Sequence, residues 1–147
     1  MARRVLFLDI DGVLNRTGFR PRESTGLRSW IEPELARRLS EVLRAIGADI
    51  VMSSDWRLNR TLPQLREELH AATIAGMLAD VTPALAGQPR WREIEAWMTA
   101  NDVAHDSAVI VDDIYDMGDL AARFVRASPL TGLDDAAVRA IRGLFGT

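Results

Sequence analysis

The sequence lacks cysteine, which excludes disulfides, thiolate zinc sites and cysteine nucleophiles. It also lacks lysine, so all 18 basic side chains are arginines, and chemistry that needs a lysine base or a Schiff base is excluded. A net charge of −3 predicts no general affinity for polyanions, so any nucleic-acid contact would be local. No apolar run has the length of a membrane span, and the start of the chain is unlike a signal peptide. We therefore expect a cytoplasmic protein with no membrane contact.

Short apolar runs alternate with helical patterns along the chain and predict a single α/β domain over residues 1–147. Helical spacing of apolar residues predicts helices from Pro33 to Gly47, around Leu65, around Ile94 and after Asp134. We expect a three-layer, Rossmann-like sandwich with a mainly parallel central sheet and no large cap domain. Residues 75–87 are expected to be a loop with at most one short strand. The predicted strands are Val5–Leu8, Ile50–Met52, Ala108–Val111 and, with a weaker pattern, Phe124–Ala127.

The first predicted strand ends in Asp9-Ile10-Asp11-Gly12. Because strand side chains alternate with period two, the carboxylates of Asp9 and Asp11 lie on one side and Ile10 points to the core. Two carboxylates about 4 Å apart repel by roughly 4 kcal/mol at an effective dielectric of about 20. The pair therefore predicts a bound divalent cation.

Two further strands also end in polar residues. The second leads into Ser53-Ser54-Asp55-Trp56-Arg57, and the third leads into Asp112-Asp113 with Asp116 close behind. Reactive groups of open α/β sheets collect at the carboxyl ends of the strands, so we expect these three segments to form one site.

These segments together resemble the motifs of the haloacid dehalogenase (HAD) superfamily of phosphatases and phosphotransferases. The run 7–13 resembles its first motif, 50–53 its second and 109–113 its fourth. More narrowly, the Asp-Gly-Val-Leu-Asn start, the Ser-Ser-x-Trp-Arg turn and the late Thr-Gly-Leu resemble small domains associated with bacterial RNA-repair proteins. A calcium-hand loop also begins with Asp-x-Asp, but its later oxygen ligands are absent here.

The resemblance implies a magnesium-dependent phosphomonoester hydrolase. Asp9 would be the nucleophile that forms an aspartyl-phosphate, and Asp11 would be the general acid and base. The expected Mg²⁺ ligands are Asp9, the backbone carbonyl of Asp11 and Asp113. Asp112 stands where many relatives have glycine, so the choice between Asp112 and Asp113 as the direct ligand stays open. Asp116 would act through water at the substrate or cap a helix.

The resemblance also assigns residues that hold the phosphoryl group. Ser53 would donate its hydroxyl to this group, with Ser54 as a weaker candidate. The usual lysine of the third motif is missing, and Arg90 is the best substitute, with Arg92 second. Arg57 would bind either a substrate phosphate or a nearby acid. Trp56, next to these residues, would pack in the core or stack on a base.

Without a large cap the site would accept the end of a macromolecule or borrow a lid from a partner protein. A phosphorylated nucleic-acid end or nucleotide is therefore the expected substrate. The irregular segment 15–32 supplies four candidate backbone contacts, Arg16, Arg20, Arg22 and Arg28. Two alternatives remain: a catalytically weak phosphate-binding or regulatory module, and a phospho-accepting signalling domain, which commonly uses a later lysine that this chain lacks. His70 and His105 lie outside every motif.

Overall fold

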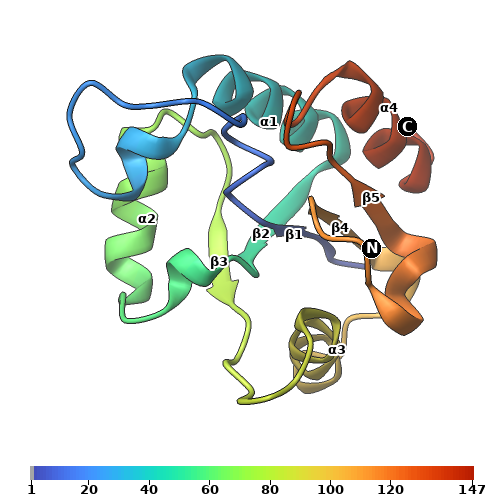
Figure 1. The fold of residues 1–147 in the computed structure, drawn as a ribbon. Coiled ribbons are helices and arrows are strands. Elements are labelled where there is room, and N and C mark those ends of the chain that lie inside the picture. The colour runs from blue at the N-terminus through green and yellow to red at the C-terminus, as the bar shows by residue number, and fades with distance from the viewer. Residues whose placement is uncertain (1) are drawn as a thin grey trace.

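The computed structural model describes residues 2–147 and contains a five-stranded sheet whose paired strands are all parallel (Figure 1). The strand order is β3-β2-β1-β4-β5. This confirms the predicted α/β class, and residues 75–87 contribute one short strand as expected. The strands are β1 (Arg4–Leu8), β2 (Ala48–Met52), β3 (Leu78–Val81), β4 (Ala108–Asp112) and β5 (Phe124–Arg126).

All the predicted helices are present, and their ends follow local sequence signals. The helix α1 has Pro33 in its first turn and ends at Gly47, which has a left-handed backbone with φ of 63°. Asp134 caps α4 by accepting a hydrogen bond from the Ala137 N–H. The α-helices are α1 (Pro33–Ile46), α2 (Leu62–Ala71), α3 (Arg90–Ala100) and α4 (Asp135–Leu144). The short 3₁₀ helices are η1 (Leu27–Trp30), η2 (Asp55–Arg57), η3 (His105–Ser107) and η4 (Gly118–Arg123).

Helices cover both faces of the sheet and complete three layers. Alternate residues of β1 enter two different cores: Leu6 and Leu8 join the apolar cluster under α1, α2 and α4, whereas Val5 and Phe7 join the cluster under α3 and η4. Figure 1 shows α1 and α4 above the sheet and α3 below it. Burial on both faces explains why the central strands are continuous apolar runs rather than alternating ones.

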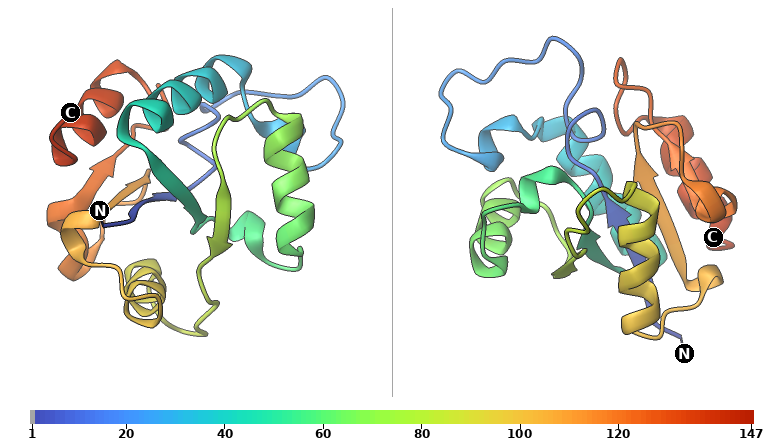
Figure 2. Two further views of the ribbon diagram at one scale, coloured as in Figure 1. Left: turned by 180° about the vertical axis from the view of Figure 1, so that it is seen from behind. Right: turned by 60° about the horizontal axis from the view of Figure 1, so that its bottom comes forward.

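The segments where a cap domain could be inserted are small. After β1 the chain forms a loop and η1 before α1 begins, and this loop arches outward beyond the sheet (blue in Figures 1 and 2). Between η2 and α3 lie only α2, β3 and their connections. Across residues 2–147, none of the helices combines the length and the apolar character needed to cross a lipid bilayer.

The strand order places β1 in the middle, with β2 on one side and β4 on the other. The strands β2 and β3 are thus added on one side of β1, and β4 and β5 are added on its other side. Open α/β sheets form a crevice at such a switch point, here between β1 and β4. Asp9 follows β1, Ser53 follows β2 and Asp112 ends β4. Three functional candidates thus meet at one edge of the sheet.

Candidate active site

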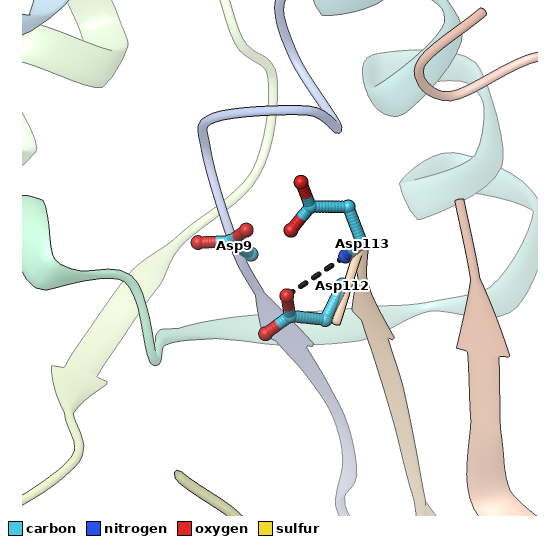
Figure 3. Close-up of side chains that lie close together, drawn as sticks. All are labelled: Asp9, Asp112 and Asp113. Atoms are coloured by element: carbon cyan, nitrogen blue, oxygen red, sulfur yellow. Dashed lines mark hydrogen bonds between the residues drawn. The ribbon is translucent and has the colours of Figure 1, made fainter. Parts of the chain in front are cut away.

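Three carboxylates converge at the crevice between β1 and β4. Asp9, Asp112 and Asp113 each offer an oxygen that lies within 4.8 Å of the others (Figure 3). Asp9 is 4% exposed and Asp112 is fully buried. The backbone holds this arrangement, because the Asp9 N–H donates to the Val111 carbonyl at 3.1 Å. The predicted proximity of the first and fourth motifs is therefore present.

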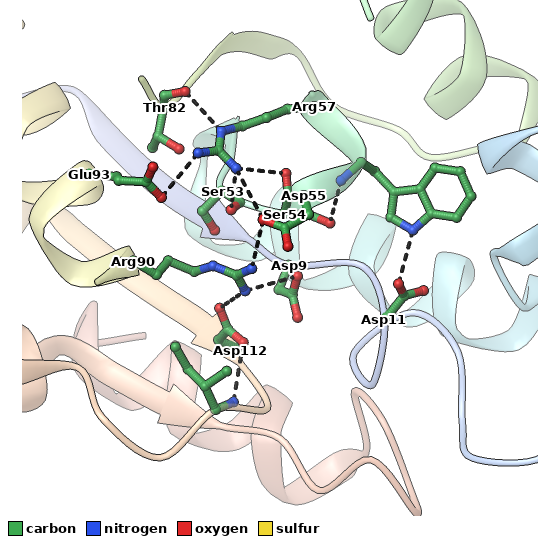
Figure 4. Close-up of polar contacts among 12 residues, drawn as sticks. Asp9, Asp11, Ser53, Ser54, Asp55, Arg57, Thr82, Arg90, Glu93 and Asp112 are labelled. Atoms are coloured by element: carbon green, nitrogen blue, oxygen red, sulfur yellow. Dashed lines mark hydrogen bonds and ion pairs between the residues drawn. The ribbon is translucent and has the colours of Figure 1, made fainter. Parts of the chain in front are cut away.

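Arg90, in the first turn of α3, reaches into this cluster (Figure 4). Its guanidinium lies 2.8 Å from Asp112, 3.3 Å from Asp9 and 3.3 Å from Asp55. Arg92 instead stacks over the Trp91 ring at 4.3 Å and stays exposed. Of the two arginines considered for the missing lysine, the fold brings only Arg90 to the acids.

The charges in this cluster do not balance. Three ionised carboxylates beside one guanidinium would leave a net charge of about −2, which suits a divalent cation. Burial raises the pKa of Asp9 to about 8, repulsion from Asp112 adds to the effect, and Arg90 opposes it. Burial likewise raises the pKa of Asp113. Burial alone would lower the pKa of Arg90, but Asp112 and Asp9 raise it above its usual value.

The neighbouring acids Asp112 and Asp113 have different surroundings. Both oxygens of Asp112 are engaged: Oδ1 accepts from the N–H groups of Asp113 and Ile114, and Oδ2 accepts from Arg90. The Asp113 carboxylate faces Asp9 (Figure 3). Gly12 lies against it with φ of 82°, and a Cβ at this position would overlap the Asp113 carboxylate. Asp113 is therefore the acid placed to share an ion with Asp9.

Ser53 supplies an unpaired hydroxyl beside these acids. Its Oγ is buried and has no hydrogen-bond partner among residues 2–147. The Ser53 N–H donates to the Leu8 carbonyl at 3.1 Å, which fixes the residue next to β1. A buried hydroxyl without a partner costs about 1–3 kcal/mol. Its position beside Asp9 therefore indicates a place for a ligand oxygen that accepts a hydrogen bond from this hydroxyl.

The residues after Ser53 build the turn η2. The Ser54 Oγ accepts from the Trp56 N–H and caps this turn. This contact does not use the hydroxyl hydrogen, so the phosphate contact considered for Ser54 stays a prediction. Asp55, the first residue of η2, lies beside Arg90 and Arg57.

Arg57 binds an acid, which is one of the two partners considered for it. Its side chain is 3% exposed and forms an ion pair with Glu93 at 3.0 Å. The same guanidinium donates to the carbonyls of Ser53, Ser54 and Thr82 (Figure 4) and to that of Pro83. The N–H groups of Arg57 are all engaged within the protein, so this side chain does not contact substrate phosphate. Of the two alternatives, the nearby acid is the partner.

Asp11 is exposed, and two side chains hold its carboxylate. The Asn15 amide donates to Oδ1 at 2.9 Å. The Trp56 indole N–H donates to Oδ2 at 3.1 Å, and Figure 4 shows this contact of Asp11. Asn15 also accepts from the Gly12 N–H and donates to the Trp30 carbonyl. Asn15 closes the Asp-Gly-Val-Leu-Asn motif, and this position in the motif is the signal that could have predicted its contact with Asp11. Trp56 packs against the larger apolar cluster, which agrees with the core alternative, and its N–H also binds Asp11.

Other candidates from the sequence have structural partners. Arg16 binds Glu32 in a bidentate ion pair, and Arg28 binds Glu68 in the same way. Within residues 2–147, Arg20 and Arg22 make no ion pair.

Asp116 accepts from the Gly118 N–H at 2.9 Å, at the start of η4. The N-cap of η4 is Met117 and no side chain caps this helix, so the contact of Asp116 is a local turn, and both roles considered for Asp116 stay predictions. His70 and His105 are exposed, on α2 and η3.

A cleft of about 430 Å³ opens on the acidic cluster. Asp11, Gly12 and Asp113 form part of its wall, so it adjoins the carboxylates directly. Phe19, Trp30 and Trp56 give it aromatic surface. A group bound at Asp9 would have this cleft beside it.

Comparisons with known proteins agree with the geometry. The profile of the family described as "HAD domain in Swiss Army Knife RNA repair proteins" matches residues 5–138, and the chain belongs to this family. No curated protein matches the chain. One crystal structure aligns with 99% of this chain and 81% of its own, at 16% identity and a TM-score of 0.47, a likeness too low to support an inference.

Proposed function

We propose that this HAD domain hydrolyses phosphomonoesters through an aspartyl-phosphate at Asp9 and uses Mg²⁺. The observation that carries the proposal is the grouping of a buried carboxylate, a guanidinium and an unpaired hydroxyl at one strand edge. Asp9, Arg90 and Ser53 supply these groups. A nucleophile, a cation and a hydrogen-bond donor around one point are what phosphoryl transfer requires.

In the first step an Asp9 carboxylate oxygen attacks phosphorus, and the bond from phosphorus to the leaving oxygen breaks. Asp11 protonates that oxygen, so the leaving group departs as an alcohol. Arg90 and the Ser53 hydroxyl stabilise the charge on the phosphoryl oxygens. Splitting the displacement in two keeps the phosphoryl group bound while the alcohol departs.

In the second step water attacks the phosphorus of the aspartyl-phosphate. Asp11, now ionised, takes a proton from this water, and the bond between phosphorus and the Asp9 oxygen breaks. Inorganic phosphate leaves and Asp9 regains its carboxylate. The hydrogen bonds from Asn15 and Trp56 keep the Asp11 carboxylate oriented for both proton transfers.

The acidic cluster fits Mg²⁺, which takes carboxylates, carbonyls and substrate oxygens. Asp9, Asp113 and the Asp11 backbone carbonyl would hold it, and when bound it would supply positive charge to the phosphoryl oxygens. Asp112 acts as a positioning residue, because its oxygens bind Arg90 and the backbone of the next two residues.

A phosphorylated nucleic-acid end is the proposed substrate. The inserted segments are small, so the site stays open to a large molecule. The family description places such HAD domains in RNA repair proteins, which agrees with a nucleic-acid substrate. A partner protein that supplies a lid would be compatible with the same opening.

The test compares the native chain with Asp9→Asn on an aryl phosphate and on 5′- and 3′-phosphorylated oligonucleotides, with Mg²⁺ and with EDTA. We expect Asp9→Asn to lower turnover at least about 10³-fold, because the amide cannot attack phosphorus. Asp102→Asn is the matched control, since Asp102 is exposed after α3 and outside the acidic cluster. Turnover that survives Asp9→Asn would remove the nucleophile. No turnover by the native chain would favour a phosphate-binding module.

A further inference from the structure

The cleft beside the acidic cluster is lined in part by aromatic side chains. Three of the chain's nine aromatic residues, Phe19, Trp30 and Trp56, line it together. Phe19 and Trp30 meet edge to face, with ring centroids 6.4 Å apart. All three are partly exposed rather than buried in the core. Aromatic surface kept open to solvent beside a polar site is typical of a ligand contact.

The cleft also lies where the leaving group of a phosphoester would be. Asp11, which the proposed mechanism uses to protonate the leaving oxygen, forms part of the wall, and Trp56 contacts this carboxylate directly (Figure 4). Asp113 is on the same wall. A phosphoryl group at Asp9 would therefore project its leaving group over the aromatic side chains.

The charge of the cleft limits how much nucleic-acid backbone it can bind. Arg16 lines the cleft, but Glu32 neutralises it through contacts as short as 2.7 Å. Arg20 also lines the cleft, donates one hydrogen bond to the Phe19 carbonyl and has no acidic partner among residues 2–147. One uncompensated guanidinium matches one phosphate beyond the reacting one.

We infer that this cleft binds the unpaired terminal nucleoside of a single-stranded nucleic acid, with its base against the aromatic side chains and the next phosphate at Arg20. A base inside a duplex has both faces stacked, and a base at a blunt end stays joined to its partner, whereas an unpaired terminal base can enter the cleft alone and place a face on Phe19 or Trp30. A volume of about 430 Å³ is within the range of pockets that hold one small ligand. This inference rests on the proposed function, because it takes the phosphoryl group to lie at Asp9.

The experiment measures binding rather than turnover, so that it can fail separately from the proposed function. The catalytically silent Asp9→Asn chain is titrated with a short phosphorylated oligoribonucleotide, the matching oligodeoxyribonucleotide and a blunt duplex, using tryptophan fluorescence. We expect at least one single strand to bind about ten-fold more tightly than the duplex. Equal or tighter binding of the duplex would overturn the inference. Selective binding by Asp9→Asn combined with an inactive native chain would remove the phosphatase and keep the nucleoside site.

Two variants in the Asp9→Asn background locate the site. Phe19→Ala should weaken single-strand binding about ten-fold, because a stacking surface is lost. Arg20→Ala should weaken it several-fold at low salt and reduce the slope of log K against log salt by about 0.7. Arg20 is exposed, so its removal leaves the fold intact.

Met77→Ala is the control, since Met77 is 58% exposed and precedes the amino end of β3, whereas the site lies at the carboxyl ends of the strands. It should bind like the parent. Unchanged affinity in both Phe19→Ala and Arg20→Ala would place the ligand elsewhere.

Discussion

The two sides of the candidate site are built differently. On one side, the side chains of Asp112, Arg57 and Arg90 lie under the strand ends and are bonded to one another or to backbone. On the other side, Asp11 and Trp56 meet at the protein surface beside the loop 15–32. A buried network has few alternative arrangements, whereas an exposed one can adjust to a ligand. Under the proposed function, the buried side would fix the chemistry and the exposed side would select the substrate.

The largest expected effect comes from breaking the buried side. Arg57→Ala would remove an ion pair with Glu93 and the donors to four carbonyls. Because Glu93, whose side chain is only 13% exposed, would lose its cationic partner and keep only the Leu85 N–H, we expect the free energy of unfolding to fall by about 3–5 kcal/mol. Urea unfolding measures the change. Arg57→Lys should recover only part of the loss, since an ammonium lacks the planar fork of donors.

Arg92→Ala is the matched control on the same helix and should cost less than about 1 kcal/mol, because its pair with Glu95 is exposed. Equal losses in Arg57→Ala and Arg92→Ala would contradict the assigned structural role of Arg57.

The second prediction concerns pH in the absence of metal. In the folded chain burial raises the pKa of Asp9 to about 8, from an ordinary value of 3.8. Between about pH 4 and pH 8 the folded chain therefore holds a proton that the unfolded chain has lost, so stability falls as pH rises through this window. With EDTA we expect a midpoint several degrees lower at pH 8 than at pH 6, at roughly 3 °C per kcal/mol.

Saturating Mg²⁺ should reduce this difference, because a bound cation stabilises the ionised carboxylates. Asp9→Asn should reduce it as well, because the amide does not titrate. Thermal unfolding of the native chain and of Asp9→Asn at both pH values checks this. The same pH dependence in both proteins would show that Asp9 is not its source.

The smallest expected effect tests the exposed side. Trp56→Phe keeps an aromatic ring but removes the N–H that holds Asp11 at 3.1 Å. If this bond orients the general acid, kcat for an alkyl phosphate should fall about ten-fold, because an alkoxide needs a proton to leave. An aryl phosphate with an acidic leaving group should be affected less.

Steady-state kinetics across a series of leaving groups measures the contrast in Trp56→Phe. Unfolding in urea, run in parallel, separates positioning from stability. A uniform loss across the series would mean that Trp56 supports the fold of the site rather than the proton transfer.

The strand edge of the site was predictable from the sequence because it depends on local periodicity. Asp9, Ser53 and Asp112 each follow or end a buried run, and parallel strands bring such ends together. Gly12 could also be recognised as part of the Asp-x-Asp-Gly motif. The close approach of Asp113, which leaves no room for a Cβ at this position, could not be predicted from the sequence.

The sequence by itself therefore determined the sheet, the helices and the edge where the acids gather, since these follow from the spacing of apolar residues and from chain direction. Only the tertiary structure decided what each polar side chain binds. Arg57 turned inward to four carbonyls and Arg90 reached the acids, although both are arginines near the ends of strands or helices. A charged side chain takes its role from partners that are distant in sequence, and folding alone sets the distances to those partners.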